Sequence, residues 1–219
     1  MFLGHFGLAM AAARVAPGAS LGTTVLAAQL ADGLWPVFML LGLEQVRIAP
    51  GITRVTPLDF VHYPYTHSLL ADAGWAALFA ALYGSLRKDW RTAGWLAALV
   101  LSHWVLDALS HRPDMPLWPG GPKVGAGLWN FTVPTLAVEY GLFVAGAWLY
   151  VRATRALDRL GTWLFAAFTL TLAGLYLASL LGPPPPSARA LAFTGLAGWL
   201  FVAWGYWIGR HRAPAIAAP

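Results

Sequence analysis

The segment Thr92–His111 reads TAGWLAALVLSHWVLDALSH, and it decides which kind of fold this chain can adopt. A helix that crosses a lipid bilayer needs about 20 mostly apolar residues. In this segment only His103, Asp107 and His111 carry side chains that ionise. Inside a bilayer the backbone N–H and C=O groups must bond to one another, and a helix achieves this within one segment. The segment therefore predicts a helical membrane protein.

The composition of the whole chain supports the same class. Of its 219 residues, 58% are hydrophobic and 11% are charged, and the mean hydropathy is +0.61. Soluble domains carry about 25% charged residues, so a water-soluble fold is excluded. The absence of cysteine excludes disulfide-stapled scaffolds, cysteine zinc fingers and thiol catalysis. Twelve Trp and seven Tyr suit a chain whose partner is a lipid bilayer with two polar interfaces.

Hydropathy predicts an all-α integral membrane protein, a single domain of six spans plus a short N-terminal helix. The expected spans are Leu21–Leu43, Thr66–Leu86, Thr92–His111, Phe131–Val151, Gly161–Leu181 and Ala188–Gly209. The last two are separate because no helix runs through Pro183–Pro186. The apolar stretch Phe2–Val15 is short and has no basic residues before it, so it predicts a helix and not a cleaved signal peptide.

Basic residues predict the orientation of this bundle, because cytoplasmic loops are enriched in Lys and Arg. Nine of the fourteen Lys and Arg residues fall on alternate connections: Arg14, Arg87, Lys88, Arg91, Arg152, Arg155, Arg159, Arg210 and Arg212. We therefore expect a cytoplasmic C-terminus, with the long loops 44–65 and 112–130 facing outward. The net charge of +5 is spread over short clusters, so nucleic acid is not an expected partner.

Several ionisable side chains are expected at a similar depth in the outer half of the spans. At about 1.5 Å per residue, Asp107 lies about 6 Å and His103 about 12 Å below the outer end of their helix. A charged side chain in a bilayer costs a few kcal/mol or more, so a shared depth indicates a shared partner. We expect a cavity open to the outside that is lined by His5, Asp32, His67, His103, Asp107 and Glu139.

The spacing of these residues favours a divalent metal. His103, Asp107 and His111 stand at i, i+4 and i+8, so they share one helix face. A second cluster, Asp59-Phe-Val-His62-Tyr-Pro-Tyr-Thr-His67-Ser68, lies where a loop enters a helix, with Thr66 as the expected N-cap. Imidazole and carboxylate ligands without sulfur suit zinc, manganese or iron(II). We expect zinc first.

Hydrogen bonding between helices is the alternative for each residue. The spacing favours a metal for His103 with Asp107, and the position of His67 favours one too. The residues alone leave both interpretations open for His5, Asp32 and His62.

Three further ionisable residues fit more than one role. His111 and Asp59 suit interfacial positions as well as they suit a metal site. Glu139 is a candidate acceptor for a ligand imidazole or a candidate general base.

A family resemblance adds to this interpretation. Within roughly residues 1–125 the chain has Gly4-His5, an Asp after an apolar helix, Tyr-Thr-His67-Ser68-Leu69-Leu70, and Leu101-Ser102-His103-Trp-Val-Leu-Asp107 before a Pro-rich loop. These elements resemble the bacterial membrane-bound, metal-dependent hydrolases, a family similar at a distance to zinc-dependent phospholipase C and P1-type nucleases. The resemblance implies the bacterial inner membrane, a metal-site core in residues 1–125, and helices in residues 131–209 that complete the bundle.

The resemblance also implies a ligand set: His5, Asp32, His62, His67, His103 and Asp107. The chain departs from the family pattern in two places. Ala31-Asp32-Gly33-Leu34-Trp35-Pro36 holds one carboxylate instead of two, and His62-Tyr63-Pro64-Tyr65 replaces a His-Arg-Gly element. A second metal would lack ligands, so a mononuclear or a non-catalytic site stays open. Asp59 and His111 are candidates to substitute.

The expected function is metal-dependent hydrolysis of an ester or phosphoester of a lipid or other amphiphile. Asp59 or Glu139 is the expected general base, and Arg112 and Lys123 are expected to bind an anionic head group. The alternative is a non-enzymatic protein, either a metal carrier or an assembly subunit with a structural metal. The inner half of the spans has almost no ionisable residues, which disfavours a carrier. Small residues in the last span permit an oligomer.

Overall fold

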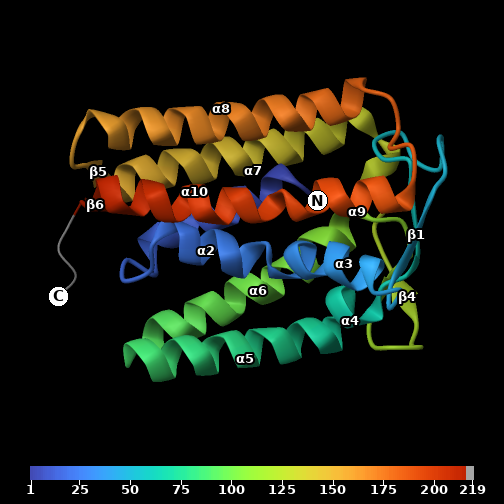
Figure 1. Ribbon diagram of the computed structural model, residues 1–219, viewed down its shortest axis with the longest axis horizontal. Coiled ribbons are helices and arrows are strands. Elements are labelled where there is room, and N and C mark those ends of the chain that lie inside the picture. The colour runs from blue at the N-terminus through green and yellow to red at the C-terminus, as the bar shows by residue number, and fades with distance from the viewer. Residues whose placement is uncertain (216–219) are drawn as a thin grey trace.

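The computed structural model describes residues 1–215, and its main elements are apolar helices that run side by side (Figure 1). Four single helices are long and apolar enough to cross a membrane: α5 (Leu69–Arg87), α6 (Trp90–Ser110), α7 (Thr132–Ala153) and α8 (Arg159–Leu181). A fifth span, Ala188–His211, is formed by α9 (Ala188–Leu196) and α10 (Gly198–His211). The expected class, an all-α membrane protein, is confirmed.

The sixth expected span, Leu21–Leu43, is broken. It consists of α2 (Leu21–Ala28) and α3 (Leu30–Leu40), which meet at Gln29 at an angle of 55°. The last carbonyls of a helix have no partner within that helix. At this break the carbonyl oxygen of Ala28 accepts a hydrogen bond from Nδ1 of His103, at 2.8 Å. The break therefore gives α6 a polar contact inside the bundle.

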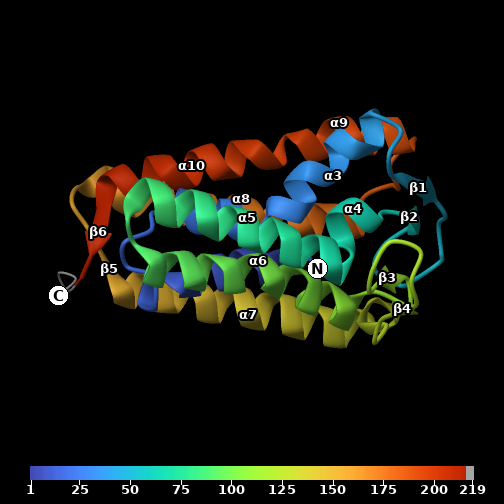
Figure 2. The same cartoon turned by 90° about the horizontal axis from the view of Figure 1, so that it is seen from below.

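The short helix α1 (Leu3–Ala11) lies in the middle of the bundle, where Leu3, Phe6 and Met10 are buried (Figures 1 and 2). It packs against α7 through glycine: a Cβ atom added at Gly146 would lie 2.0 Å from the carbonyl oxygen of Gly7. Only glycine allows two helix backbones to approach this closely. The N-terminal segment is therefore a central element of the fold.

Side-chain caps set where several helices begin, because they satisfy free N–H groups of the first turn. Ser68 caps α5 by accepting from the N–H of Ala71 at 3.2 Å, and Asp158 caps α8 by accepting from Gly161 at 2.8 Å. Thr66, the expected N-cap, instead lies within the short helix α4 (Pro64–His67), because the chain turns again at Ser68 before α5 starts.

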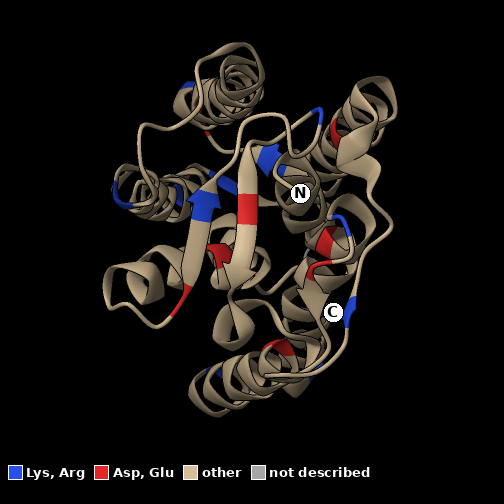
Figure 3. Ribbon diagram, turned by 90° about the vertical axis from the view of Figure 1, so that its right-hand side faces the viewer, with Lys and Arg blue, Asp and Glu red and all other residues tan. Residues whose placement is uncertain are grey.

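Small sheets occupy both ends of the bundle. At one end, here called the hairpin end, β1 (Gln45–Ile48) pairs with β2 (Leu58–His62), and β3 (Met115–Pro116) pairs with β4 (Lys123–Val124), all antiparallel (Figure 3). These hairpins lie within the expected long loops. At the opposite end, here called the basic end, β5 (Thr154–Ala156) pairs with β6 (Arg212–Pro214). Two 3-10 turns complete the order, η1 (Ala12–Arg14) and η2 (Leu128–Asn130).

Candidate metal centre

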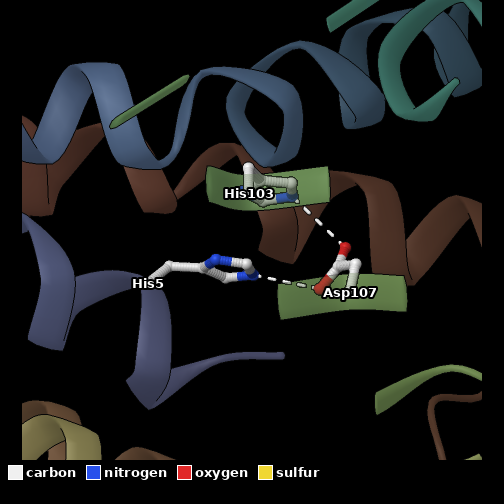
Figure 4. A group of neighbouring side chains, drawn as sticks. All are labelled: His5, His103 and Asp107. Atoms are coloured by element: carbon white, nitrogen blue, oxygen red, sulfur yellow. Dashed lines mark hydrogen bonds and ion pairs between the residues drawn. The ribbon is translucent and has the colours of Figure 1, made fainter. Parts of the chain in front are cut away.

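Histidine and aspartate side chains from four helices meet one to two turns below the hairpin end. Two overlapping groups have ligand atoms within 4.8 Å of one another: His5, His103 and Asp107 (Figure 4), and also Asp32, His67 and His103. They come from α1, α3, α4 and α6, so four separate helices build one cluster. All but Asp32 are buried.

Asp107 is the centre of this cluster. Its Oδ1 lies 3.1 Å from Nε2 of His5. Its Oδ2 faces three more Nε2 atoms, at 3.3 Å for His103, 3.7 Å for His111 and 3.8 Å for His67. The amino group of Met1 also contacts Oδ1 of Asp107.

Asp32 brings a second carboxylate to the same histidines. Its Oδ1 lies 3.4 Å from Nε2 of His67 and 3.7 Å from Nε2 of His103. Ligands held tetrahedrally at about 2.0–2.1 Å from an ion stand about 3.3–3.4 Å apart, whereas N–H···O hydrogen bonds measure about 2.7–3.2 Å. Apart from the contacts that His5 and the amino group of Met1 make with Asp107, the nitrogen–oxygen separations in the cluster are longer than hydrogen bonds and close to the spacing of metal ligands.

The ring of His103 presents a lone pair to the cluster. Its Nδ1 contacts the carbonyl oxygen of Ala28, which can only accept, so Nδ1 carries the proton. Nε2 is therefore unprotonated in the neutral ring, and within residues 1–215 it has no hydrogen-bond partner. A metal-ligating histidine uses its second nitrogen in this way.

His67 is held by a chain of two hydrogen bonds. The hydroxyl of Thr66 donates to Oε2 of Glu44 at 2.6 Å, so it must accept from Nδ1 of His67, at 2.7 Å. Glu44 is fixed in turn by the backbone N–H groups of Tyr65 and Thr66, at 2.8 and 2.9 Å. Nε2 of His67 is left to face Asp32 and Asp107.

His111 is fixed by Asp114, whose Oδ1 lies 2.9 Å from Nδ1 of the ring. Asp114 also accepts from Nε of Arg112 at 3.1 Å and from the hydroxyl of Tyr63 at 3.0 Å. Burial raises the pKa of Tyr63 well above its usual range, so this hydroxyl stays protonated and donates. Arg112 also contacts Asp59, so a chain of charged groups supports His111 from the hairpin end.

His5 and Asp72 keep polar atoms without partners beside this cluster. The ring of His5 stacks on that of His103, with centroids 3.9 Å apart, and its buried Nδ1 has no partner in the described part of the chain. Asp72, in the first turn of α5, is fully buried, and neither of its oxygens accepts a hydrogen bond from residues 1–215. A buried polar group without a partner costs free energy, so these three atoms are consistent with a site that takes a cation.

Three of the predicted site residues lie outside the cluster. His62, at the end of β2, is exposed and contacts the ring of Tyr65 edge-on. Asp59 forms ion pairs with Arg112 and with Arg47, the latter at 2.7 Å. Glu139 accepts from the backbone N–H groups of Phe2 and Gly4, at 3.0 and 2.9 Å, and so holds the start of α1.

The two basic residues expected to bind a head group are engaged with the protein itself. Arg112 pairs with Asp59 and Asp114, and Lys123 donates to the carbonyl oxygen of Val61 at 3.3 Å.

The supporting residues Glu44 and Asp114 were not among the predicted site residues. Asp114 follows His111 by three positions, a spacing that could have pointed to it. Glu44 lies 22 residues before Thr66 and has no such signal, because the β1–β2 hairpin alone brings the two together.

A cavity of about 810 Å³ lies next to the cluster. Asp32, His67, Asp107 and His111 form part of its wall. Glu139 lines the cavity as well. The rest of the wall is mainly apolar and includes Leu26, Met39 and Phe201. Pockets that hold drug-sized ligands measure about 300–1,000 Å³, so the cavity is large enough for a substrate next to the cluster.

The chain is similar to a known membrane protein family along nearly its whole length. A family model described as YdjM inner membrane protein matches residues 1–211. No curated protein and no solved structure matches the chain.

Proposed function

Because the chain belongs to the YdjM inner membrane protein family, we propose that it works within that membrane, as a metal-dependent hydrolase of an ester or phosphoester. The proposed substrate is a lipid or other amphiphile. The family description gives a location and no reaction, so the proposal rests on the site and on the resemblance to membrane-bound, metal-dependent hydrolases.

One observation carries the proposal. Three imidazole rings have Nδ1 bound to an acceptor, and their Nε2 atoms face two carboxylates at 3.3–3.8 Å. This donor set fits zinc, and it also suits manganese or iron(II). The residues proposed to hold the ion are Asp32, His67, His103 and Asp107, with His5 and His111 beside them.

The bound ion and the protein would contribute different parts of the proposed hydrolysis. A divalent metal held there supplies a Lewis acid, which lowers the pKa of water and polarises the oxygen of the scissile group. The chain keeps the rings in place through Ala28, Thr66 and Asp114. Of the two expected bases, Glu139 lines the cavity and is the better candidate to accept a proton. We assign Asp59 the supporting position that its pairing with Arg112 favours.

The first experiment is elemental mass spectrometry of the purified protein, prepared without chelator. We expect about one divalent ion per chain in the wild type, and its loss in Asp107→Ala and in the milder Asp32→Asn. His62→Gln is the matched control, because His62 was a predicted ligand and lies outside the cluster. A folded, metal-free wild type would overturn the proposal.

A second experiment separates the hydrolase from a protein with a structural metal. Detergent-solubilised protein is assayed on bis(p-nitrophenyl) phosphate and on p-nitrophenyl butyrate. Turnover that disappears in Asp32→Asn supports a hydrolase. A full metal content without turnover of either compound favours the structural alternative.

A further inference from the structure

The cavity beside the cluster extends to the flank of the bundle. What we infer from its shape rests on the proposed function. Its wall is formed by Leu175, Ser179 and Leu180 on α8 and by residues from Leu191 to Val202 on the α9–α10 span. Closer to the basic end, α8 and α10 pack directly, with the ring of Phe168 5.7 Å from that of Trp204 and 6.0 Å from that of Phe201. The two spans therefore enclose the cavity only in their halves nearest the hairpin end.

The cavity opens through the side of the bundle. Leu175 is 48% exposed and Trp199 is 37% exposed, and both line the cavity. Gly198 also lines it and is exposed. These residues lie on spans whose outer surfaces face lipid, so the opening faces the acyl chains of the bilayer and not water alone. An apolar chain could reach the cluster by this route without leaving an apolar environment.

Two cationic groups belong to residues on this wall: the amino group of Met1, which is paired with Asp107, and the guanidinium of Arg54. Arg54 is the single Lys or Arg among the cavity-lining residues of the described chain. Its loop is ordered by a hydrogen bond from its own N–H to the carbonyl of Trp129, at 3.1 Å, and by Thr53 Oγ1 bonding to the carbonyl of Thr56 at 2.8 Å. The guanidinium is exposed and forms no ion pair within residues 1–215, whereas Arg47 and Arg112 are both paired with carboxylates. A free guanidinium matches the geometry of a phosphate group.

We propose that the cavity binds a phosphate-bearing amphiphile that comes from the bilayer between α8 and the α9–α10 span, with its chain against these helices and its phosphate paired with Arg54. Arg54 is then the residue that selects anionic head groups. The acyl chain of the ligand supplies the apolar contact area, and the cluster of histidines and aspartates faces the head-group end of the ligand.

The test is lipid binding, measured by native mass spectrometry of detergent-solubilised protein in the presence of chelator. Three probes are compared: phosphatidic acid, diacylglycerol with the same chains, and inorganic phosphate. We expect phosphatidic acid to bind about tenfold more tightly than diacylglycerol, the effect of one charge-assisted contact. Arg54→Gln should abolish this preference, and Arg47→Gln, the paired control, should keep it. An unchanged preference in Arg54→Gln would overturn the role of Arg54. Inorganic phosphate binding as tightly as phosphatidic acid would overturn the amphiphile.

A pair of glycine variants tests the route. A Cβ atom at Gly198 and one at Gly174 would each meet nothing within 4 Å, so both positions accept a side chain. Gly198 lines the cavity and Gly174 does not. We expect Gly198→Phe to weaken binding of both lipids about tenfold or more, because the new ring occupies cavity space and displaces apolar contacts of the acyl chain. Gly174→Phe should leave binding unchanged. Wild-type binding by Gly198→Phe would exclude this cavity.

These outcomes stay separate from those of the hydrolase proposal. Chelator removes the metal, so lipid selection is measured without turnover. A protein that binds metal and hydrolyses esters but has no preference for phosphatidic acid would refute only the lipid inference. A metal-free protein that prefers phosphatidic acid would refute only the hydrolase.

Discussion

At the scale of single residues, the cluster depends on groups that never face the cavity. The rings of His103, His67 and His111 are each oriented by an acceptor on Nδ1: a backbone carbonyl, a hydroxyl and a carboxylate. Such partners fix which nitrogen carries the proton and where the lone pair points, and their loss typically lowers metal affinity about 10–100-fold. The supporting residues are therefore as testable as the ligands.

Thr66 gives the clearest test at this scale, because its hydroxyl both accepts from His67 and donates to Glu44. We expect Thr66→Val, which keeps the shape and removes the hydroxyl, to weaken zinc binding about 10–100-fold. The measurement is competition against a chromogenic chelator. Thr66→Ser retains the hydroxyl and should bind zinc as the wild type does. Equal affinity of the Val and Ser variants would show that this hydrogen bond does not orient the ring.

At the scale of elements, polar side chains join helices at their ends. Asp158 caps α8 through the N–H of Gly161 and pairs with Nδ1 of His211 in α10, at 2.7 Å. These contacts lower the pKa of Asp158 below its ordinary value of 3.8, with the hydrogen bond from His211 as the largest cause. A lowered pKa in the folded protein means that the carboxylate form stabilises the fold.

The pH dependence follows from this sign. The contribution of Asp158 is present above the unfolded pKa of about 3.8 and is lost as pH falls through the lower folded value. We expect the wild type to unfold at a higher temperature than Asp158→Ala at pH 7, and the difference to shrink steadily below about pH 4. Thermal unfolding in detergent between pH 7 and 3 measures it. A difference that grows on acidification would contradict the assignment.

Glycine contacts between helices form a second kind of element-scale constraint. A Cβ at Gly146 would lie 2.0 Å from the carbonyl oxygen of Gly7, whereas one at Gly141, also on α7, would meet nothing within 4 Å. We expect Gly146→Ala to destabilise the protein by roughly 1–3 kcal/mol through overpacking. It should also lower the metal content, because α1 carries His5. Gly141→Ala is the matched control and should leave both unchanged. Thermal unfolding and elemental mass spectrometry are the readouts.

At the scale of the whole molecule, the cluster and the cavity lie near one end of the bundle, while many basic residues lie at the other. Arg152, Arg155 and Arg159 surround β5, and Arg210 and Arg212 lie at and beside β6. Lys and Arg are enriched on the cytoplasmic side of inner-membrane proteins. On this basis we expect the basic end in the cytoplasm and the hairpin end outside.

The absence of cysteine makes this orientation directly measurable. Single-cysteine variants Pro119→Cys, at the hairpin end, and Arg155→Cys, at the basic end, are treated in intact cells with a membrane-impermeant maleimide. We expect Pro119→Cys to react at once and Arg155→Cys to react only after permeabilisation. The reverse labelling would place the cluster on the cytoplasmic side.

Much of the fold could be predicted from local sequence, and the reason is physical. A bilayer requires about 20 apolar residues per crossing, so hydropathy alone located the spans, including α6 and α8. The break at Gln29 was not predicted, because hydropathy measures how apolar a segment is and not whether its helix axis changes direction. The β1–β2 hairpin was not predicted either, since its short strands pair across a long loop and show no strong alternation of apolar and polar residues.

The candidate site divides in a similar way. Helical spacing and shared depth pointed to His5, Asp32, His67, His103, Asp107 and His111, which the fold brings together. Shared depth pointed to Glu139 as well, but its carboxylate accepts hydrogen bonds from the backbone at the start of α1 instead. His62 was expected beside them because it is close in sequence to His67. It lies at the end of β2, where the register of the hairpin shifts, and its side chain is exposed. Its proximity to His67 along the chain therefore did not predict that its side chain is exposed.

The sequence by itself determined the membrane environment of this protein, the positions of its apolar segments and the residue types available to bind a cation, because these depend on composition and on local spacing. Only the tertiary structure decided which residues support the ligands and where a substrate could approach. Glu44 reaches Thr66 across a hairpin, and the cavity is lined jointly by α8, by the α9–α10 span and by the β1–β2 loop that carries Arg54. Both depend on contacts between segments far apart in the chain, and no local pattern encodes such contacts.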